Sequence, residues 1–290
     1  MIVKSTPQNA QDVKTTATNP ATKECISILT DAMKHGETIF IKVHAAEALI
    51  FNNYYTGVDA CFKELVKEPG NQIVATRVLA RTNKKDPKKY KSYINTLLYQ
   101  LEHADSVRGK LIALESLSKL GFHDPLPVIK NYADTGSGGF KSMSRWVLAN
   151  SGKAEDEAHL AAMLTSTEPA DYRTAAYALR FFKTIRPETI PLLVDCANRI
   201  EKDQPARVYV ISSLFVHAPT ARVRQDTKAK LLTYLTGAAG EKYEVAEALA
   251  VAGTRDDIPT VKKLLADENT DVRVAAAKAM LSIQSKKINE

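Results

Sequence analysis

The stretch DDIPTVKKLLADENTDVRVAAAKAMLSI, residues 256–283, decides the fold of this chain. Its first half repeats apolar residues at helical spacing, as at Val261 and Leu265. Its second half places small residues, among them Ala276 and Ala279, on one side of a helix, because residues three or four apart share a face. A narrow stripe of this kind lets a neighbouring helix approach closely. The stretch therefore predicts two consecutive helices that pack against others.

The pattern of the second half recurs along the chain. A close copy is IKVHAAEAL at 41–49, which matches VRVAAAKAM at 272–280. Weaker copies are QIVATRVL (72–79), LIALESL (111–117), SMSRWVL (142–148), RTAAYAL (173–179), VYVISSL (208–214) and YEVAEAL (243–249). The copies close on large aliphatic residues, namely Leu49, Leu79, Leu117, Leu148, Leu179, Leu214, Leu249 and Met280. Their spacings of 30 to 38 residues fit two helices and two turns per unit.

A second apolar stripe precedes each copy, as in CISILTDAM at 25–33 and YINTLLYQL at 93–101. Gly and Pro residues fall between the stripes, and Pro suits helix starts whereas Gly suits helix ends. Alternation of the kind that indicates a β-strand is absent over any useful length. We therefore expect an all-α fold, built as an α-solenoid of about eight stacked helical pairs.

The segment TDVRVAAAKAMLSI, with Asp271 and Arg273 near its start, resembles a HEAT repeat of the short bacterial type, one of the armadillo-type α-solenoids. The resemblance covers roughly residues 22–285 and implies a right-handed solenoid of HEAT-like pairs. In that family the arginine supports the turn and the aspartate begins the second helix. Arg108 and Arg207 are the other arginines here that fit this role.

The first 21 residues differ from the rest of the chain. Residues 1–21 are polar and lack the apolar stretch of a signal peptide. We expect a flexible leader followed by one solenoid domain over 22–290. The compartment stays open, because the chain as written suits the cytoplasm, whereas removal of a signal peptide would place it in the periplasm or envelope. No run approaches the roughly 18 apolar residues of a membrane-spanning helix.

The sequence lacks the residue patterns that are typical of a metal or cofactor site. Solenoids of this family include a di-iron hydroxylase, which needs repeated His-Glu dipeptides to ligate its irons. None of the six histidines here is followed by Glu. Cys25, Cys61 and Cys196 are widely spaced, which favours buried free thiols, with a Cys25–Cys61 bridge as the alternative. We expect no metal, no cofactor and no enzymatic activity.

In HEAT arrays the second helix of each pair lines the concave face. The seventh positions of the units are therefore expected there, and they are Glu47, Arg77, Glu115, Trp146, Tyr177, Ser212, Glu247 and Lys278. Glu47, Arg77 and Glu115 suggest an ion-pair ladder, and His44 has the spacing to hydrogen bond with Glu47. The predicted binding residues are Arg145, Trp146, Arg173, Tyr177, Arg180 and Tyr243, since Trp, Tyr and Arg dominate interface energies. Packing of the aromatic side chains between units is the alternative.

A basic segment gives a second candidate surface. The chain has a formal net charge of +7, and much of the excess lies in RVLARTNKKDPKKYK at 77–91, where Asp86 is the only acid. An anionic partner would contact Arg77, Arg81, Lys84, Lys85, Lys88 and Lys89. A solvated loop between helices is the alternative.

These features together favour a non-enzymatic scaffold that binds a protein or peptide on its concave face. A deep pocket with polar groups aimed at one point would contradict that interpretation. Nucleic-acid binding is the alternative, for example by an alkylpurine DNA glycosylase, and it draws on the basic segment and Trp146. A bilin lyase of the related short-repeat class is a further alternative, although no feature of the sequence requires it. The oligomeric state stays open.

Overall fold

The computed structural model describes residues 19–202 and 204–286, and these residues contain sixteen α-helices and no β-strand. The all-α prediction is confirmed. The first helices of the pairs are α2 (Pro20–His35), α4 (Val58–Leu65), α6 (Pro87–His103), α8 (Pro127–Thr135), α10 (Ala154–Ala162), α12 (Thr189–Arg199), α14 (Ala221–Leu232) and α16 (Ile258–Leu265). The second helices are α3 (Ile39–Phe51), α5 (Gln72–Thr82), α7 (Val107–Lys119), α9 (Gly138–Ala149), α11 (Pro169–Leu179), α13 (Arg207–Val216), α15 (Ala239–Ala252) and α17 (Thr270–Ser285). Short 3₁₀ turns lie at Pro69–Asn71, Met163–Thr165, Thr233–Thr236 and Arg255–Asp257.

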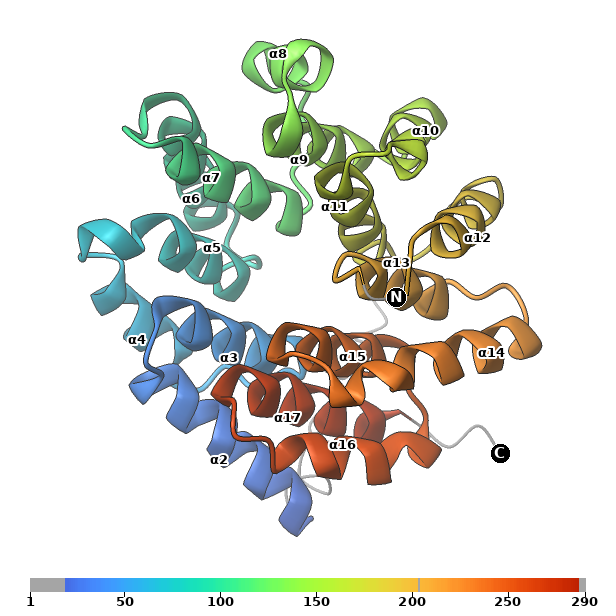
Figure 1. The fold of residues 1–290 in the computed structure, drawn as a ribbon. Coiled ribbons are helices and arrows are strands. Elements are labelled where there is room, and N and C mark those ends of the chain that lie inside the picture. Colours follow the sequence, from blue (N-terminus) through green and yellow to red (C-terminus); the bar gives the residue numbers. More distant parts are fainter. Residues whose placement is uncertain (1–18, 203, 287–290) are drawn as a thin grey trace, which may run out of the picture.

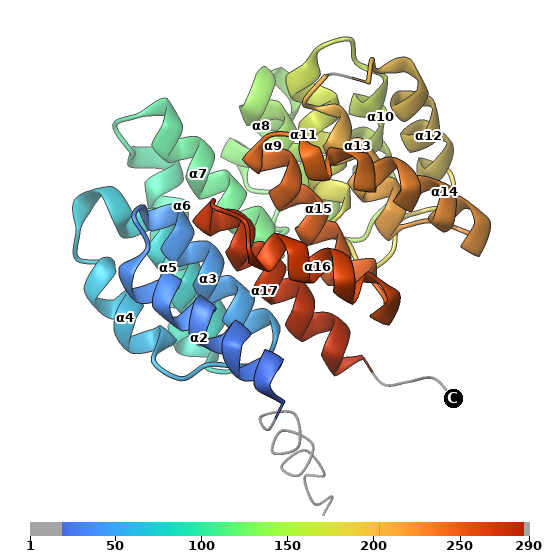
Figure 2. The same ribbon diagram turned by 60° about the horizontal axis from the view of Figure 1, so that its bottom comes forward.

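The stack of helices closes into a ring. The odd-numbered helices form an inner wall, and the even-numbered helices lie outside it (Figure 1). Each inner helix contacts the next, and α17 contacts α2 and α3, so the last pair meets the first (Figure 2). An open solenoid would leave one side of each terminal unit exposed. Here α17 is buried on both sides, and ten of its residues are buried.

The seam between the first and last pairs carries polar contacts as well. Ser282 donates a hydrogen bond to the side chain of Asn52 at 3.1 Å, and Asn52 donates to the backbone carbonyl of Lys278 at 3.4 Å. Thr22 donates to Gln284 at 2.9 Å. These contacts join residues more than 220 positions apart in sequence. Hydrogen bonds therefore connect the first helical pair to the last.

The repeat pattern explains the core. All eight closing aliphatic residues are buried in the inner helices, from Leu49 in α3 to Met280 in α17. The small residues that precede them, such as Ala276 and Ala279, are fully buried. Because alanine adds little bulk, the inner helices approach one another closely around the whole wall.

The start of α17 shows how a pair turns. Arg273 donates from Nη1 to the backbone carbonyls of Asp267 and Glu268 at 2.8 Å each, as expected for an arginine that supports the turn. The cap is Asn269 rather than Asp271, because the Asn269 side chain accepts hydrogen bonds from two backbone N–H groups of the first turn. The expectation that Asp271 begins this helix is corrected accordingly.

The other two arginines differ from Arg273. Arg207 donates from Nε to the carbonyl of Ala197 at 3.1 Å, which ties α13 to the end of α12. Arg108 instead lies over the ring of Phe40, with 5.9 Å between its guanidinium carbon and the ring centroid. The expected leader, 1–21, falls mostly outside the described residues, but Pro20 and Ala21 already belong to α2.

Ring closure predicts energetic coupling between Asn52 and Ser282. In a double-mutant cycle of Asn52→Ala and Ser282→Ala, we expect a coupling energy of about 0.5–1 kcal/mol from urea unfolding, because the two side chains share a hydrogen bond. Ser118 lies on α7 and makes its hydrogen bonds to Leu114 and Met143. Its Ser118→Ala variant, combined with Asn52→Ala, should give additive effects. Additivity in both cycles would contradict an energetic contribution from this hydrogen bond across the seam.

Candidate functional site

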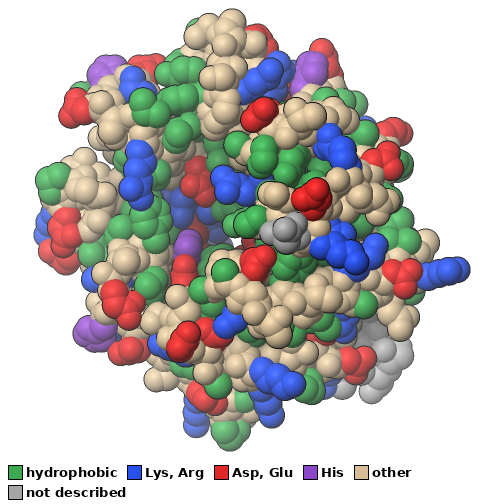
Figure 3. All heavy atoms as spheres, viewed as in Figure 1, with side chains coloured by type: hydrophobic (Ala, Val, Ile, Leu, Met, Phe, Trp, Pro, Cys, Tyr) green, Lys and Arg blue, Asp and Glu red, His purple; other side chains and the backbone are tan. Residues whose placement is uncertain are grey.

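The inner helices enclose a cavity of about 370 Å³ at the centre of the ring. Acidic and basic side chains surround the hollow that is visible there (Figure 3). The charged and tyrosine side chains that line it are His44, Glu47, Arg81, Lys119, Tyr177, Arg180, Lys183, Tyr243, Glu247 and Lys278. The sequence expected many of these residues on a concave face, and closure of the ring converts that face into a cavity wall.

The first cluster of charges in the wall involves α3, α5 and α7. Arg77 donates from Nε to Glu47 at 2.8 Å, and Lys119 pairs with Glu115 at 2.9 Å. Burial would raise the pKa of Glu115, but Lys119 and Arg77 outweigh it and lower that pKa to about 2. Burial would also raise the pKa of Glu47, which its cationic neighbours hold far below the ordinary range. Both carboxylates are therefore ionised at neutral pH.

The expected ion-pair ladder is confirmed in part. Arg77 does pair with Glu47, whereas Glu115 takes Lys119 and the hydroxyl of Tyr177, which donates to it at 3.1 Å. His44 does not hydrogen bond with Glu47 as expected. Its Nδ1 lies 2.8 Å from Asp271 across the seam instead.

The second cluster of charges joins the end of α11 with α15 and α17. The buried Arg180 pairs with Glu244 at 2.9 Å and with Glu247 at 3.3 Å, and Lys278 pairs with Glu247 at 2.6 Å. Burial would raise the pKa of Glu247, but Lys278 and Arg180 outweigh it and lower that pKa to about 2. Burial raises the pKa of Glu244 despite the nearby Arg180. In both clusters, cations pair with carboxylates.

Trp146 is a core residue and not a contact residue. Its side chain is fully buried, with ring centroids 5.7 Å from Tyr177 and 5.2 Å from Phe181. The prediction that Trp146 binds a partner is therefore wrong, because the neighbouring inner helices cover the indole. Arg77 and Arg180 are also buried, so neither presents its charge on an open surface.

The other predicted binding residues divide into two groups. Tyr177 and Tyr243 line the central cavity together with Arg180. Arg145 and Arg173 do not line it. Arg145 pairs with Asp134 of α8 at 3.0 Å, and Arg173 is exposed. The structure therefore does not bring the six predicted residues into one surface.

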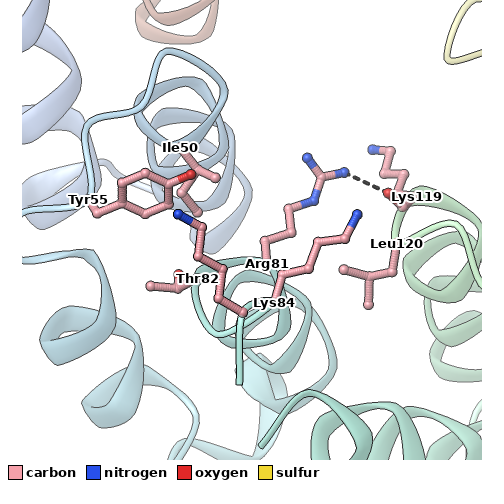
Figure 4. A pocket seen from close by; sticks show the side chains of 8 residues that line it. Ile50, Tyr55, Arg81, Thr82, Lys84, Lys119 and Leu120 are labelled. Carbon is pink, nitrogen blue, oxygen red and sulfur yellow. Dashed lines mark hydrogen bonds between the residues drawn. The ribbon is translucent and has the colours of Figure 1, made fainter. Parts of the chain in front are cut away.

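A second cavity, of about 500 Å³, lies where α3, α5 and α7 end. Its lining contains four cationic side chains and no carboxylate; the residues are Ile50, Tyr55, Arg81, Thr82, Lys84, Lys85, Lys119 and Leu120. Tyr55 and Ile50 stand on one side of it, Lys119 and Leu120 on the other, and Arg81 lies between them (Figure 4). Arg81 and Lys119 line both cavities, so the two spaces adjoin.

The basic segment found in the sequence is divided by the fold. Arg81, Lys84 and Lys85 meet at the second cavity. Lys88 and Lys89 are exposed in the first turn of α6 and do not line it, while Arg77 turns inward to Glu47. The expectation of a single patch of six cations is corrected to a smaller group of three, joined by Lys119 from the next inner helix.

Exposed apolar side chains gather at the same end of the ring. Of the six large apolar side chains that are exposed in the described part of the chain, four line these two cavities, namely Phe51, Tyr55, Phe181 and Val251. We call the surface formed by these four residues with Arg81, Lys84, Lys85 and Lys119 the basic–aromatic mouth. A shared apolar and cationic opening of this kind is unusual for a surface without a partner.

Sequence reasoning missed most of this mouth, although a signal was present. Phe51, Arg81, Lys119, Phe181 and Val251 each follow a closing aliphatic residue by two positions. All five line the central cavity near the ends of their helices. One position of the repeat therefore supplies the side chains of one opening.

The described residues contain no group of three or more His, Cys, Asp or Glu side chains placed to hold a metal ion. Cys25 and Cys196 are buried free thiols, and Cys61 is a partly buried free thiol. Over 19–202 and 204–286, no helix has both the length and the apolar character needed to cross a lipid bilayer.

Comparisons with known proteins add little. No known sequence family and no curated protein matches the chain. Two solved structures, both described as engineered proteins, align over 92% of this chain with 16% and 19% identity and a TM-score of 0.34. The alignments cover 98% and 79% of those two proteins. Likeness at this level carries no argument about function.

The buried charges predict a large effect at Arg180. Arg180→Met should reduce the free energy of unfolding by about 3–5 kcal/mol, because Glu244 and Glu247 lose their guanidinium partner inside the protein. Arg145→Met is the matched control, since Asp134 is largely exposed, and it should cost at most about 1 kcal/mol. Urea unfolding of both variants measures the difference. Equal losses would contradict a special role for the buried cluster.

Acid should destabilise the ring. The pKa values of Glu115 and Glu247 fall from the ordinary 4.5 to about 2 in the folded chain. Their contribution to stability is complete above pH 4.5 and is lost as the pH falls toward 2. The melting temperature should therefore drop between pH 5 and pH 2.5, measured by circular dichroism. In the Glu115→Gln variant the melting temperature should fall less over this pH range. An unchanged fall would contradict Glu115 as a source of the acid sensitivity.

Proposed function

We propose that this chain is a non-enzymatic HEAT-repeat scaffold that holds an acidic, aromatic-containing segment of a partner protein at the basic–aromatic mouth. The observation that carries the proposal is the gathering of exposed aromatic side chains and four cations around adjoining cavities. Aromatic and cationic side chains provide large contact area and charge complementarity to such a segment.

Pairing of the charges supports binding rather than catalysis. The central cavity is deep enough to raise the question of an active site, since several titratable groups face it. Several of those groups, however, are held in ion pairs within 3.3 Å, as Arg180 is with Glu244 and Glu247 and as Lys119 is with Glu115. A general acid or base needs a titratable group that can reach a substrate proton. The paired arrangement instead suits a rigid wall behind the mouth.

The inner face favours an acidic peptide over a nucleic acid. Duplex DNA contacts an extended basic stripe through its phosphates. Here the wall alternates in sign, with four buried or partly buried glutamates among its cations, namely Glu47, Glu115, Glu244 and Glu247. The buried Trp146 has no free face for a flipped base. Lys84 and Lys85 of the mouth are exposed cations beside a cavity without a carboxylate, which suits a short acidic segment.

A peptide-display selection tests the proposal. Random peptides selected on the full chain should become enriched in Asp or Glu next to Phe, Tyr, Trp or Leu. Binding of a selected peptide, measured by fluorescence anisotropy, should weaken at least tenfold in Lys84→Glu/Lys85→Glu. It should also weaken in Phe51→Ser/Phe181→Ser, because these changes remove the aromatic contacts.

The matched control is Lys88→Glu/Lys89→Glu, which changes the net charge by the same amount on exposed residues outside the mouth. It should change the affinity less than twofold. Equal weakening in both lysine variants would contradict the mouth as the site. Enrichment of basic peptides, or tight binding of duplex DNA at low salt in preference to the peptides, would overturn the proposal.

A further inference from the structure

The cavity between the ends of α3, α5 and α7 has an excess of positive charge that the protein itself does not balance. Its lining holds Arg81, Lys84, Lys85 and Lys119 and no acidic residue. Glu47 pairs with Arg81 and Glu115 pairs with Lys119, and no ion pair with Lys84 or Lys85 is found among the described residues. With Arg77, which shares Glu47, five cations face two carboxylates, and three positive charges remain.

The existing pairs leave Arg81 available to a ligand. Glu47 is held by Arg77 at 2.8 Å, and Arg81 lies farther from the same carboxylate oxygen, at 3.4 Å. The guanidinium of Arg81 is instead positioned by the backbone carbonyl of Lys119, to which its Nη2 donates at 3.0 Å (Figure 4). The side chain is thus fixed at the cavity wall, and it shares its carboxylate partner with Arg77.

Lys119 is fixed in a similar way. Its amine pairs with Glu115 at 2.9 Å, and its side chain is nearly buried. Burial lowers the pKa of Lys119, and the nearby Arg77 adds to this effect. A further anion in the cavity would stabilise the charged amine. Lys84 and Lys85 differ because they are exposed, and they can move to follow a ligand.

We propose that this cavity binds a doubly charged phosphoryl group on a phosphorylated side chain of the partner segment. This inference rests on the proposed function. A single carboxylate offsets one of the three excess charges, whereas a phosphoryl group offsets close to two and presents three acceptor oxygens. The planar fork of Arg81 suits two of those oxygens, and mobile lysines serve as point charges for the remainder.

The surroundings favour a phosphorylated peptide over free phosphate. Tyr55 and Phe51 are about half exposed and line the two adjoining cavities, Tyr55 beside the four cations. Free phosphate would leave the exposed parts of these rings uncovered. The residues that flank a phosphorylated side chain would cover the rings. One partner segment would therefore contact both the cations and the aromatic side chains of the mouth.

Substitution within one selected acidic peptide tests the inference. Each glutamate in turn is replaced by phosphoserine and by serine, and affinities for the full chain are measured by isothermal titration calorimetry. At one position, phosphoserine should bind at least tenfold more tightly than glutamate. In Lys84→Met/Lys85→Met that preference should fall below threefold, and in Lys88→Met/Lys89→Met it should persist. Arg81→Met serves as a second variant with the same expected loss, and circular dichroism checks its fold.

The outcomes separate this inference from the proposed function. If phosphoserine and glutamate bind equally at every position, the phosphoryl site is overturned while acidic-peptide binding stands. If inorganic phosphate alone binds as tightly as the phosphopeptide and displaces it, the cavity is a site for the free anion and the peptide source is overturned. If no acidic peptide binds the chain, the proposed function fails as well.

Discussion

Closure of the ring is the constraint on which the rest of this structure depends. Helix α17 must pack against α15 on one side and against α2 and α3 on the other. An end helix in an open array needs a polar outer side, but α17 buries Val272, Ala276 and Met280 among its ten buried residues. Closure therefore removes both terminal surfaces of the array, and the burial of α17 makes the first and last pairs depend on each other.

Closure also determines the character of the inner wall. In an open solenoid, charges on the concave face are solvated and their pairs contribute little to stability. Inside a narrow ring the same positions are shielded from water, so each charge needs a partner. The chain meets this need in two clusters, around Arg77 with Glu47 and around Arg180 with Glu244 and Glu247. The charges of the wall thus support the fold and leave few groups free for chemistry.

The sequence predicts the helices well, because each depends on local spacing. The closing residues from Leu49 to Met280 are all buried, and all-α structure follows from that periodicity. Closure was not predictable, since it depends on small rotations summed over many pairs. The prediction for Trp146 fails for a similar reason. Its burial depends on the neighbouring helices and not on the sequence of its own helix. Within the predicted basic segment, Arg81 lines the second cavity, whereas Arg77, one helical turn earlier, is buried and paired with Glu47.

The mouth and the wall differ in how much a substitution would affect the fold. Position seven of each unit points into the wall, where Arg77 and Glu247 are held in buried pairs. In five of the eight units the position two residues after the closing aliphatic lines the central cavity, and Phe51 and Phe181 are exposed there. Substitution of Phe51 or Phe181 removes an exposed aromatic side chain and no ion pair of the wall, whereas Lys119 at the same repeat position is paired with Glu115. The exposed apolar residues at this repeat position can therefore vary while the charged wall stays the same.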